Sequence, residues 1–135
     1  MNRQTSLTKA QAIQISRQFI AKGLRNEQWY LHAQAYVKAI VLYGSTAKGL
    51  NRPDSDIDLL IFLPLAVEQQ YTSGEYFYNF AGHEINIVIR SIERLREIAQ
   101  KQEDLLQKEV FRGSVIIESS DNEIAELLAT IAKIQ

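Results

Sequence analysis

Two aspartates separated by one residue, Asp56 and Asp58, follow the dipeptide Gly44-Ser45 after ten intervening residues. In a β-strand, residues two apart project to the same face, so both carboxylates are expected to point the same way. Two like charges at this spacing repel each other unless a cation lies between them, and paired carboxylates suit Mg²⁺. The pair therefore predicts a metal site in which Asp56 and Asp58 are both ligands and catalytic residues.

The loop before the aspartates has the composition of a phosphate-binding turn. Gly44 and Ser45 follow an apolar segment and precede an expected helical turn, where backbone N–H groups favour phosphate. Lys48 adds positive charge, and Thr46 and Ser55 complete the set of nucleotide-binding candidates. A phosphate-binding loop that faces a pair of magnesium ligands is what phosphoryl or nucleotidyl transfer requires. The alternative is a solvated strand–turn–strand without a ligand.

Apolar strands on both sides of this loop are expected to position these residues. The patterns predict strands over 37–43, 56–63, 75–80, 84–90 and 113–118, with the third and fourth forming a hairpin. They predict helices over about 7–22, over 91–108 with Leu105 and Leu106 inward, and after a capping box at Ser120–Glu123, whereas 26–36 is ambiguous. The sum is an α/β (α+β) fold, a mixed sheet with flanking helices.

Composition limits the classes of function. A chain of 135 residues, 46% hydrophobic and 23% charged, predicts a single domain over 1–135. The absence of cysteine excludes thiol nucleophiles and cysteine–zinc sites. The net charge of −1 is not strongly basic, so no direct nucleic-acid binding is expected. No apolar run is long enough for a membrane span and no signal peptide is evident, so we expect no membrane association and a cytoplasmic location.

The stretch from Val41 to Leu63, in which Gly44-Ser45 and Asp56-Ile57-Asp58 lie between apolar strands, resembles the signature of the DNA polymerase β-like nucleotidyltransferase superfamily. The chain resembles its minimal nucleotidyltransferases, which are often paired with HEPN-domain partners as antitoxins of toxin–antitoxin systems. The resemblance implies a polymerase β-like nucleotidyltransferase core, binding of Mg-ATP, and transfer of AMP to an acceptor hydroxyl with release of pyrophosphate. It also implies a HEPN-type protein partner; a homo-oligomer is the other arrangement considered.

The third carboxylate of that superfamily has no direct match. The corresponding strand reads Glu84-Ile85-Asn86-Ile87, so an asparagine occupies the expected position and Glu84 lies two residues earlier on the same face. Asparagine can coordinate a metal through its carbonyl oxygen but cannot act as a general base. Three readings stay open: Glu84 substitutes for the missing acid, the acceptor supplies its own base, or the protein binds nucleotide and transfers slowly or never.

These features predict an enzyme, a nucleotidyltransferase that moves AMP from Mg-ATP to a hydroxyl of a partner protein or another acceptor. Because the expected core uses nearly the whole chain, we expect another molecule to present the acceptor. One alternative is a nucleotide-binding, antitoxin-like subunit that acts by protein binding. Another is a small-molecule transferase similar to aminoglycoside nucleotidyltransferases.

Aromatic residues gather after the acidic strand and have two readings. The group consists of Tyr71, Tyr76, Phe77, Tyr78 and Phe80. Such rings can stack on adenine or another base. Aromatic residues also favour strands, and packing of one hairpin face is the interpretation we favour.

Overall fold

The computed structural model describes residues 7–49, 56–71 and 74–135. Its helices are α1 (Lys9–Lys22), α2 (Gln28–Ala33), α3 (Gly44–Ala47), α4 (Leu65–Glu68), α5 (Ile92–Lys101), α6 (Leu105–Val110) and α7 (Glu123–Ala132), with 3-10 turns at Leu24–Asn26 and Gln34–Tyr36. Its strands are β1 (Ala39–Tyr43), β2 (Ile57–Leu63), β3 (Glu75–Phe80), β4 (His83–Ser91) and β5 (Val115–Ser119). Every predicted strand is present, and the ambiguous segment 26–36 is a series of short helical turns around α2.

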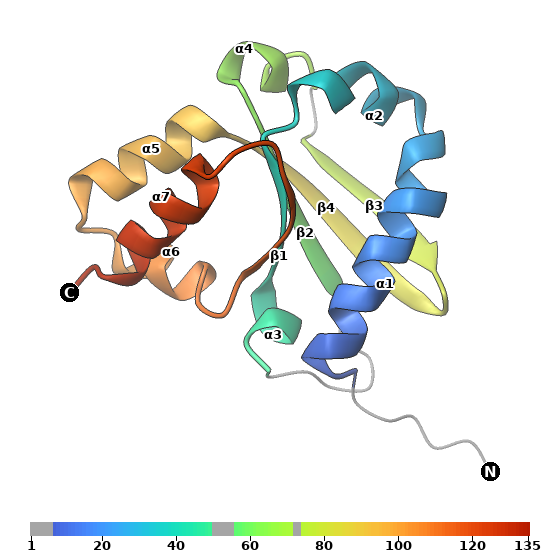
Figure 1. The fold of residues 1–135 in the computed structure, drawn as a ribbon, viewed down its shortest axis with the longest axis horizontal. Helices are drawn as coiled ribbons and strands as arrows, with labels where there is room; N and C mark the ends of the chain where they lie inside the picture. The colour runs from blue at the N-terminus through green and yellow to red at the C-terminus, as the bar shows by residue number, and fades with distance from the viewer. Residues whose placement is uncertain (1–6, 50–55, 72–73) are drawn as a thin grey trace.

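The strands form one five-stranded sheet in the order β3-β4-β2-β1-β5 (Figure 1). β2 and β4 run parallel, whereas β1 pairs antiparallel with β2 and β5, and β3 pairs antiparallel with β4. Helices lie on both sides of this sheet (Figure 1). The expected mixed sheet with flanking helices is confirmed.

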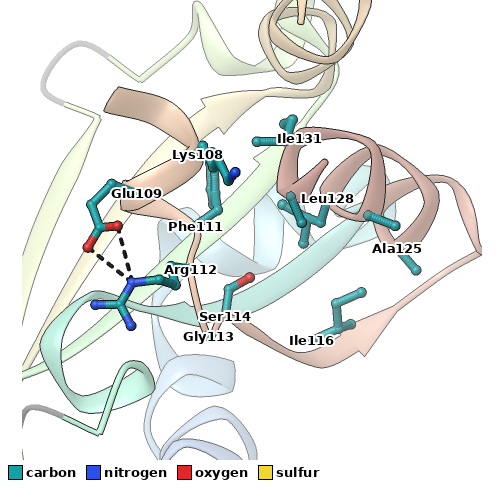
Figure 2. A pocket seen from close by; sticks show the side chains of 12 residues that line it. Lys108, Glu109, Phe111, Arg112, Gly113, Ser114, Ile116, Ala125, Leu128 and Ile131 are labelled. Carbon is teal, nitrogen blue, oxygen red and sulfur yellow. Dashed lines mark hydrogen bonds and ion pairs between the residues drawn. The ribbon is translucent and has the colours of Figure 1, made fainter. Parts of the chain in front are cut away.

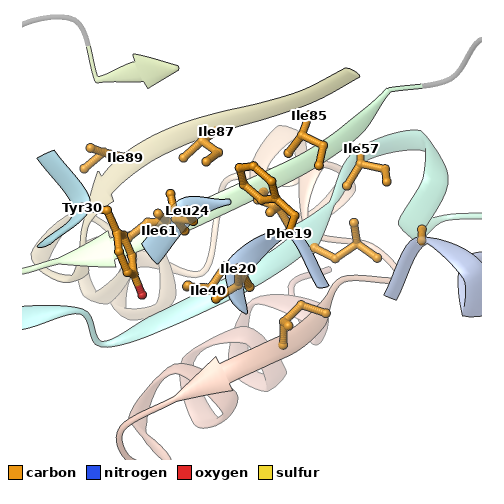
Figure 3. Close-up of a cluster of buried hydrophobic side chains, with 14 of the residues drawn as sticks. Phe19, Ile20, Leu24, Tyr30, Ile40, Ile57, Ile61, Ile85, Ile87 and Ile89 are labelled. Carbon is orange, nitrogen blue, oxygen red and sulfur yellow. The ribbon is translucent and has the colours of Figure 1, made fainter. Parts of the chain in front are cut away.

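One face of the sheet is covered by the N-terminal helices. Thr8 caps the start of α1 and forms a capping box with Gln11, and the helix buries Phe19 and Ile20 against the sheet. The alternating isoleucines of β2 and β4, among them Ile61 and Ile87, supply the facing side chains (Figure 3). Because side chains alternate between the two faces of a strand, the residues between these isoleucines point to the opposite face of the sheet.

The opposite face is covered only in part by the C-terminal helices. Leu60 and Phe62 of β2 pack there against Leu95 and Ile98 of α5 and against Ile131 of α7. Further along the same face, β3 and β4 carry side chains that are exposed or half-buried in the described part of the chain. The polar candidates of β2 and β4 lie on this open part.

The predicted helix over 91–108 is wrong in its second half. α5 ends at Lys101, Gln102 adopts a left-handed conformation with φ of 52°, and α6 starts afresh at Leu105. Asp104 caps the new helix by accepting a hydrogen bond from the Gln107 N–H at 3.0 Å. The break turns the predicted inward pair outward, so Leu105 is 58% and Leu106 is 72% exposed.

The predicted capping box at Ser120–Glu123 is also wrong. α7 begins at Glu123, and the Glu123 N–H donates to Asp121 Oδ1 at 2.9 Å instead of to Ser120. The Glu123 carboxylate accepts two hydrogen bonds from Arg96, at 2.6 and 2.9 Å. Because the Glu123 side chain is held by Arg96, it does not turn back to accept the hydrogen bond from the backbone that a capping box needs.

Within the described residues, no helix combines the length and the apolar character that a membrane crossing needs.

Candidate active site

Gly44 brings the loop that follows β1 into direct contact with the acidic strand. Its φ of +82° lies in the left-handed region, which favours glycine. A Cβ atom at this position would lie 2.5 Å from Asp58 Oδ2. Glycine is therefore required here for two reasons, and the loop packs against the carboxylate with no space between them.

Asp56 and Asp58 meet through a third side chain. The Asn86 Nδ2 group lies 3.1 Å from Asp56 Oδ2 and 3.2 Å from Asp58 Oδ1, and donates to both. Asp58 stands beside Asn86 in the parallel β2–β4 register and opposite Tyr43 in the β1–β2 register. The prediction that both aspartates face the same side is thus consistent with the shared amide.

Asn86 leaves one polar atom without a partner. Its Oδ1 is buried and accepts no hydrogen bond, whereas its Nδ2 reaches both carboxylates. Rotation of the amide by half a turn would direct this oxygen toward the carboxylates, an arrangement that only a cation between them makes favourable. Two carboxylates and an amide oxygen are ligands that suit a hard divalent cation.

Burial and mutual repulsion perturb the ionisation of the site. The pKa of Asp58 is raised, mainly because the carboxylate is removed from water, and the nearby Asp56 charge acts in the same direction. The hydrogen bond from Asn86 opposes this shift. Beside Asp58, burial and the carboxylate charge raise the pKa of Tyr43 to about 12. A bound cation would stabilise the ionised form of Asp58, which is half-buried.

Glu84 reaches the aspartate pair from the neighbouring strand. Its pKa is raised, first by the charge of Asp56 and then by a hydrogen bond with that carboxyl. The side chain is exposed, so a proton on it can exchange with an incoming group or with water. This interaction with Asp56 is compatible with the reading in which Glu84 substitutes for the missing acid, which stays a prediction.

The remaining nucleotide-binding candidates occupy different settings. Ser45 is exposed at the start of α3. Thr46 is buried and its Oγ1 donates to the Asp56 backbone carbonyl at 2.9 Å, which fastens the loop to the acidic strand. Lys48 Nζ lies 3.5 Å from Glu109 Oε1, and its side chain is only 14% exposed. Ser55 lies outside the described residues.

Sequence reasoning missed two neighbours of the site. Tyr43 shares the face of Asp58, and continuing the alternation of β1 past Val41 would have identified it. Glu109 pairs with Lys48 from 61 residues away (109 − 48), and no local pattern signals that contact. In the described part of the chain, no three Asp, Glu, His or Cys side chains are arranged to hold a metal by themselves. A bound ion would need phosphate or water oxygens as well.

A cavity between the C-terminal helices and β5 is lined by residues other than the two aspartates. It has a volume of about 590 Å³ and is enclosed by α6, the turn after it, β5 and α7 (Figure 2). Phe111, Ile116 and Leu128 line it, and the Glu109–Arg112 ion pair stands at its edge (Figure 2). Neither Asp56 nor Asp58 lines this cavity, but Glu109, which does, pairs with Lys48 of the candidate phosphate loop.

Comparisons with known proteins identify the fold and the family. A solved nucleotidyltransferase-like protein from Exiguobacterium sibiricum 255-15 superposes with a TM-score of 0.58 at 10% sequence identity, over 91% of this chain and 39% of that chain. The present chain thus spans well under half of that neighbour, and the likeness shows the fold alone. No curated protein matches the sequence. A family model described as a nucleotidyltransferase domain matches residues 26–122, a span that includes the Gly44-Ser45 loop, both aspartates and β4. Since this match covers most of the sequence, the chain belongs to the nucleotidyltransferase domain family.

Proposed function

We propose that the protein transfers AMP from ATP to a hydroxyl group of an acceptor, with Mg²⁺ held by Asp56 and Asp58. The observation that carries this proposal is the contact of three elements at one point. Gly44 of the loop lies against Asp58, and one amide of Asn86 reaches both aspartates. The loop that would hold the phosphates therefore lies directly beside the acids that would hold the metal ion.

The chain's own residues divide the work of the reaction. Gly44 and Ser45 would hold the β- and γ-phosphates, through backbone N–H groups and the exposed Ser45 hydroxyl. Lys48 would neutralise phosphate charge after it exchanges Glu109 for the nucleotide. When bound, Mg²⁺ would supply charge neutralisation at the α-phosphate. Asn86 Oδ1, which is buried and unpaired, would serve as a further oxygen ligand once its amide rotates.

Glu84 is the proposed general base. Its carboxylate would accept the proton of the attacking hydroxyl while the new oxygen–phosphorus bond forms and the bond to pyrophosphate breaks. Glu84 is exposed and lies on the face of β4 that also carries Asn86, so an acceptor hydroxyl can approach its carboxylate. The proton of the hydroxyl passes to Glu84, and the electron pair of the broken oxygen–phosphorus bond leaves with pyrophosphate.

The acceptor is proposed to lie on another molecule, a HEPN-type partner protein or a second copy of this chain. The superfamily resemblance suggests the HEPN-type partner, an analogy rather than a property of the fold. The experiment is incubation with α-labelled ATP and Mg²⁺, with and without the product of the neighbouring gene. Label on the partner that is lost in Asp56→Asn supports transfer. Absence of label on any acceptor, while Mg-ATP still binds, contradicts it.

Asn86 favours one second function, a nucleotide-binding subunit without turnover. Its amide donates to both carboxylates and therefore occupies the space where a cation would lie. In this function the protein would act by binding a protein partner in the manner of an antitoxin. Asn86→Asp separates the two: a gain of transfer indicates that the missing acid limits a working enzyme, and no gain at unchanged nucleotide affinity favours the binding subunit.

A further inference from the structure

We propose that Phe77 of β3 determines acceptor specificity by packing against a flat, apolar group next to the reacting hydroxyl. The inference rests on the proposed function and adds the chemical class of the acceptor. It starts from the one aromatic residue of the hairpin that does not pack with the others.

Most aromatic side chains of this region serve the core. Tyr76 stacks on Trp29 with ring centroids 4.0 Å apart, and Tyr78 accepts a hydrogen bond from Trp29 Nε1 at 2.7 Å. Phe80 lies against Phe19. The favoured interpretation of the aromatic group, that it packs one hairpin face, is therefore confirmed for these residues. Phe77 points to the opposite face and is 65% exposed.

The strand register places Phe77 in line with the candidate site. Phe77 stands directly opposite Asn86 in the antiparallel β3–β4 pair. Asn86 stands beside Asp58, and Asp58 stands opposite Tyr43, the residue before Gly44. Since neighbouring strands lie about 4.8 Å apart, Phe77 is roughly 10 Å across the sheet from Asp58. One face thus carries an ordered row from the phosphate loop through the acids to an exposed ring.

The in-line geometry of the transfer indicates which end of this row would face pyrophosphate and which would face the acceptor. The attacking and leaving oxygens lie on opposite sides of the phosphorus atom in such a transfer. Pyrophosphate departs on the side of Gly44 and Ser45, which is the β1 side of Asp58. The acceptor hydroxyl must therefore approach from the β4 side, above Asn86 and Glu84. The part of the acceptor beyond its hydroxyl then lies over Phe77.

The chemistry of this end defines what fits. An exposed aromatic ring offers a face for a ring or another flat apolar group. Asp56, Asp58 and Glu84 lie near Asn86, and Arg90 lies four residues further along the same face of β4, so an anionic acceptor beside Asn86 is disfavoured. The matching acceptor is neutral or cationic and bears its hydroxyl close to an apolar ring, unlike a strongly hydrated polyol.

Fluorine NMR with two alcohol probes tests this assignment. The protein is loaded with Mg²⁺ and α,β-methylene-ATP, and line broadening is measured for 4-fluorobenzyl alcohol and for 2-fluoroethanol. The wild type is expected to bind the benzyl probe in preference to the aliphatic one. Phe77→Ala should weaken binding of the benzyl probe about fivefold or more, as expected for the loss of one stacked ring. Phe77→Tyr should retain it.

Tyr36→Ala is the matched control, since Tyr36 is an aromatic residue 53% exposed outside this row. It should change neither probe nor nucleotide binding. Equal binding of the benzyl probe by the wild type and Phe77→Ala overturns the inference. So does weaker α,β-methylene-ATP binding in Phe77→Ala, because Phe77 would then stack on the nucleotide's own base. If the wild type fails to bind the Mg²⁺–nucleotide complex, the proposed function itself fails, a result distinct from both.

Discussion

Asp58 is the residue on which the other parts of the site depend. Gly44 lies against its carboxylate, Asn86 donates to it, Tyr43 lies opposite it, and burial raises its pKa. A half-buried acid held beside a second acid is costly to the fold unless something neutralises it. A cation between the two carboxylates would neutralise this charge, and in the structure the Asn86 amide offsets part of it.

Gly44→Ala is predicted to destabilise the protein more than Gly49→Ala. Both glycines have positive φ, 82° and 77°, so both substitutions carry the same backbone penalty. Only at Gly44 would the new Cβ meet another atom, 2.5 Å away on Asp58, whereas nothing lies within 4 Å at Gly49. We expect a loss of about 2–4 kcal/mol at Gly44 and about 1 kcal/mol at Gly49, measured by urea unfolding. Equal losses would contradict the close packing of the loop on Asp58.

Asp58→Asn is predicted to stabilise the metal-free protein at neutral pH. The folded-state pKa of Asp58 is raised above its ordinary value of 3.8, so the folded protein binds more protons than the unfolded chain between the two values. The free energy of unfolding therefore falls as pH rises through this interval. Asn removes that loss, and a gain of about 1 kcal/mol, or about 3 °C in Tm, is expected.

Thermal unfolding in EDTA from pH 4 to pH 7 measures this effect. The difference in Tm between Asp58→Asn and wild type should grow as the pH rises. Glu103→Gln, an exposed substitution outside the site, should show no such trend. A lower Tm for Asp58→Asn at pH 7 would show that the carboxylate is not strained in the metal-free fold.

The sequence predicts the local parts of the site and fails where distant segments meet. The spacing of Asp56 and Asp58 and the glycine before Ser45 are local features, and period-2 alternation suffices to place them. The Lys48–Glu109 contact and the exposure of Phe77 depend on how helices cover the sheet. Period-2 alternation within β3 separates Phe77 from Tyr76, Tyr78 and Phe80, but it does not indicate which of the two faces a helix covers.

Among the elements, the break between α5 and α6 shows how an apolar pattern can mislead. Leu105 and Leu106 continue the apolar spacing of α5, which is why one long helix was the simplest prediction. The intervening Gln102, Glu103 and Asp104 offer nothing apolar to the core, and Asp104 is a good N-cap. The apolar pattern identified both helical segments but not the break between them. Asp104 can cap α6 only where the chain has already left α5, and the apolar spacing does not show where that happens.

Gln102→Gly is predicted to stabilise the protein by about 0.5–1 kcal/mol. Gln102 has a φ of 52°, in the left-handed region where glycine has no Cβ penalty. Gln100→Gly is the matched control, since Gln100 is an exposed glutamine inside α5, and it should cost about 1 kcal/mol. Urea unfolding of both variants measures the difference. The same sign for both would mean that the helix does not end at Lys101.

For the molecule as a whole, the charge asymmetry of the sequence becomes a set of contacts between its two parts. Residues 1–50 hold seven basic residues and one acid, and residues 51–135 hold eight and fifteen. Arg25 pairs with Glu118, Lys48 pairs with Glu109, and Lys9 donates to the Gly113 carbonyl. The basic segment is therefore partly matched by the acidic one, while Asp58 and Glu84 share the open face with Arg90.

Calorimetric titration with α,β-methylene-ATP, with Mg²⁺ or with EDTA, tests the central claim most directly. We predict binding by the wild type that depends on Mg²⁺, and a loss of that dependence in Asp56→Asn and Asp58→Asn. The analogue cannot be cleaved between its α- and β-phosphates, so the measurement reports the site without an acceptor. Equal affinity with and without Mg²⁺, or unchanged binding in both variants, would contradict a metal–nucleotide site at the two aspartates.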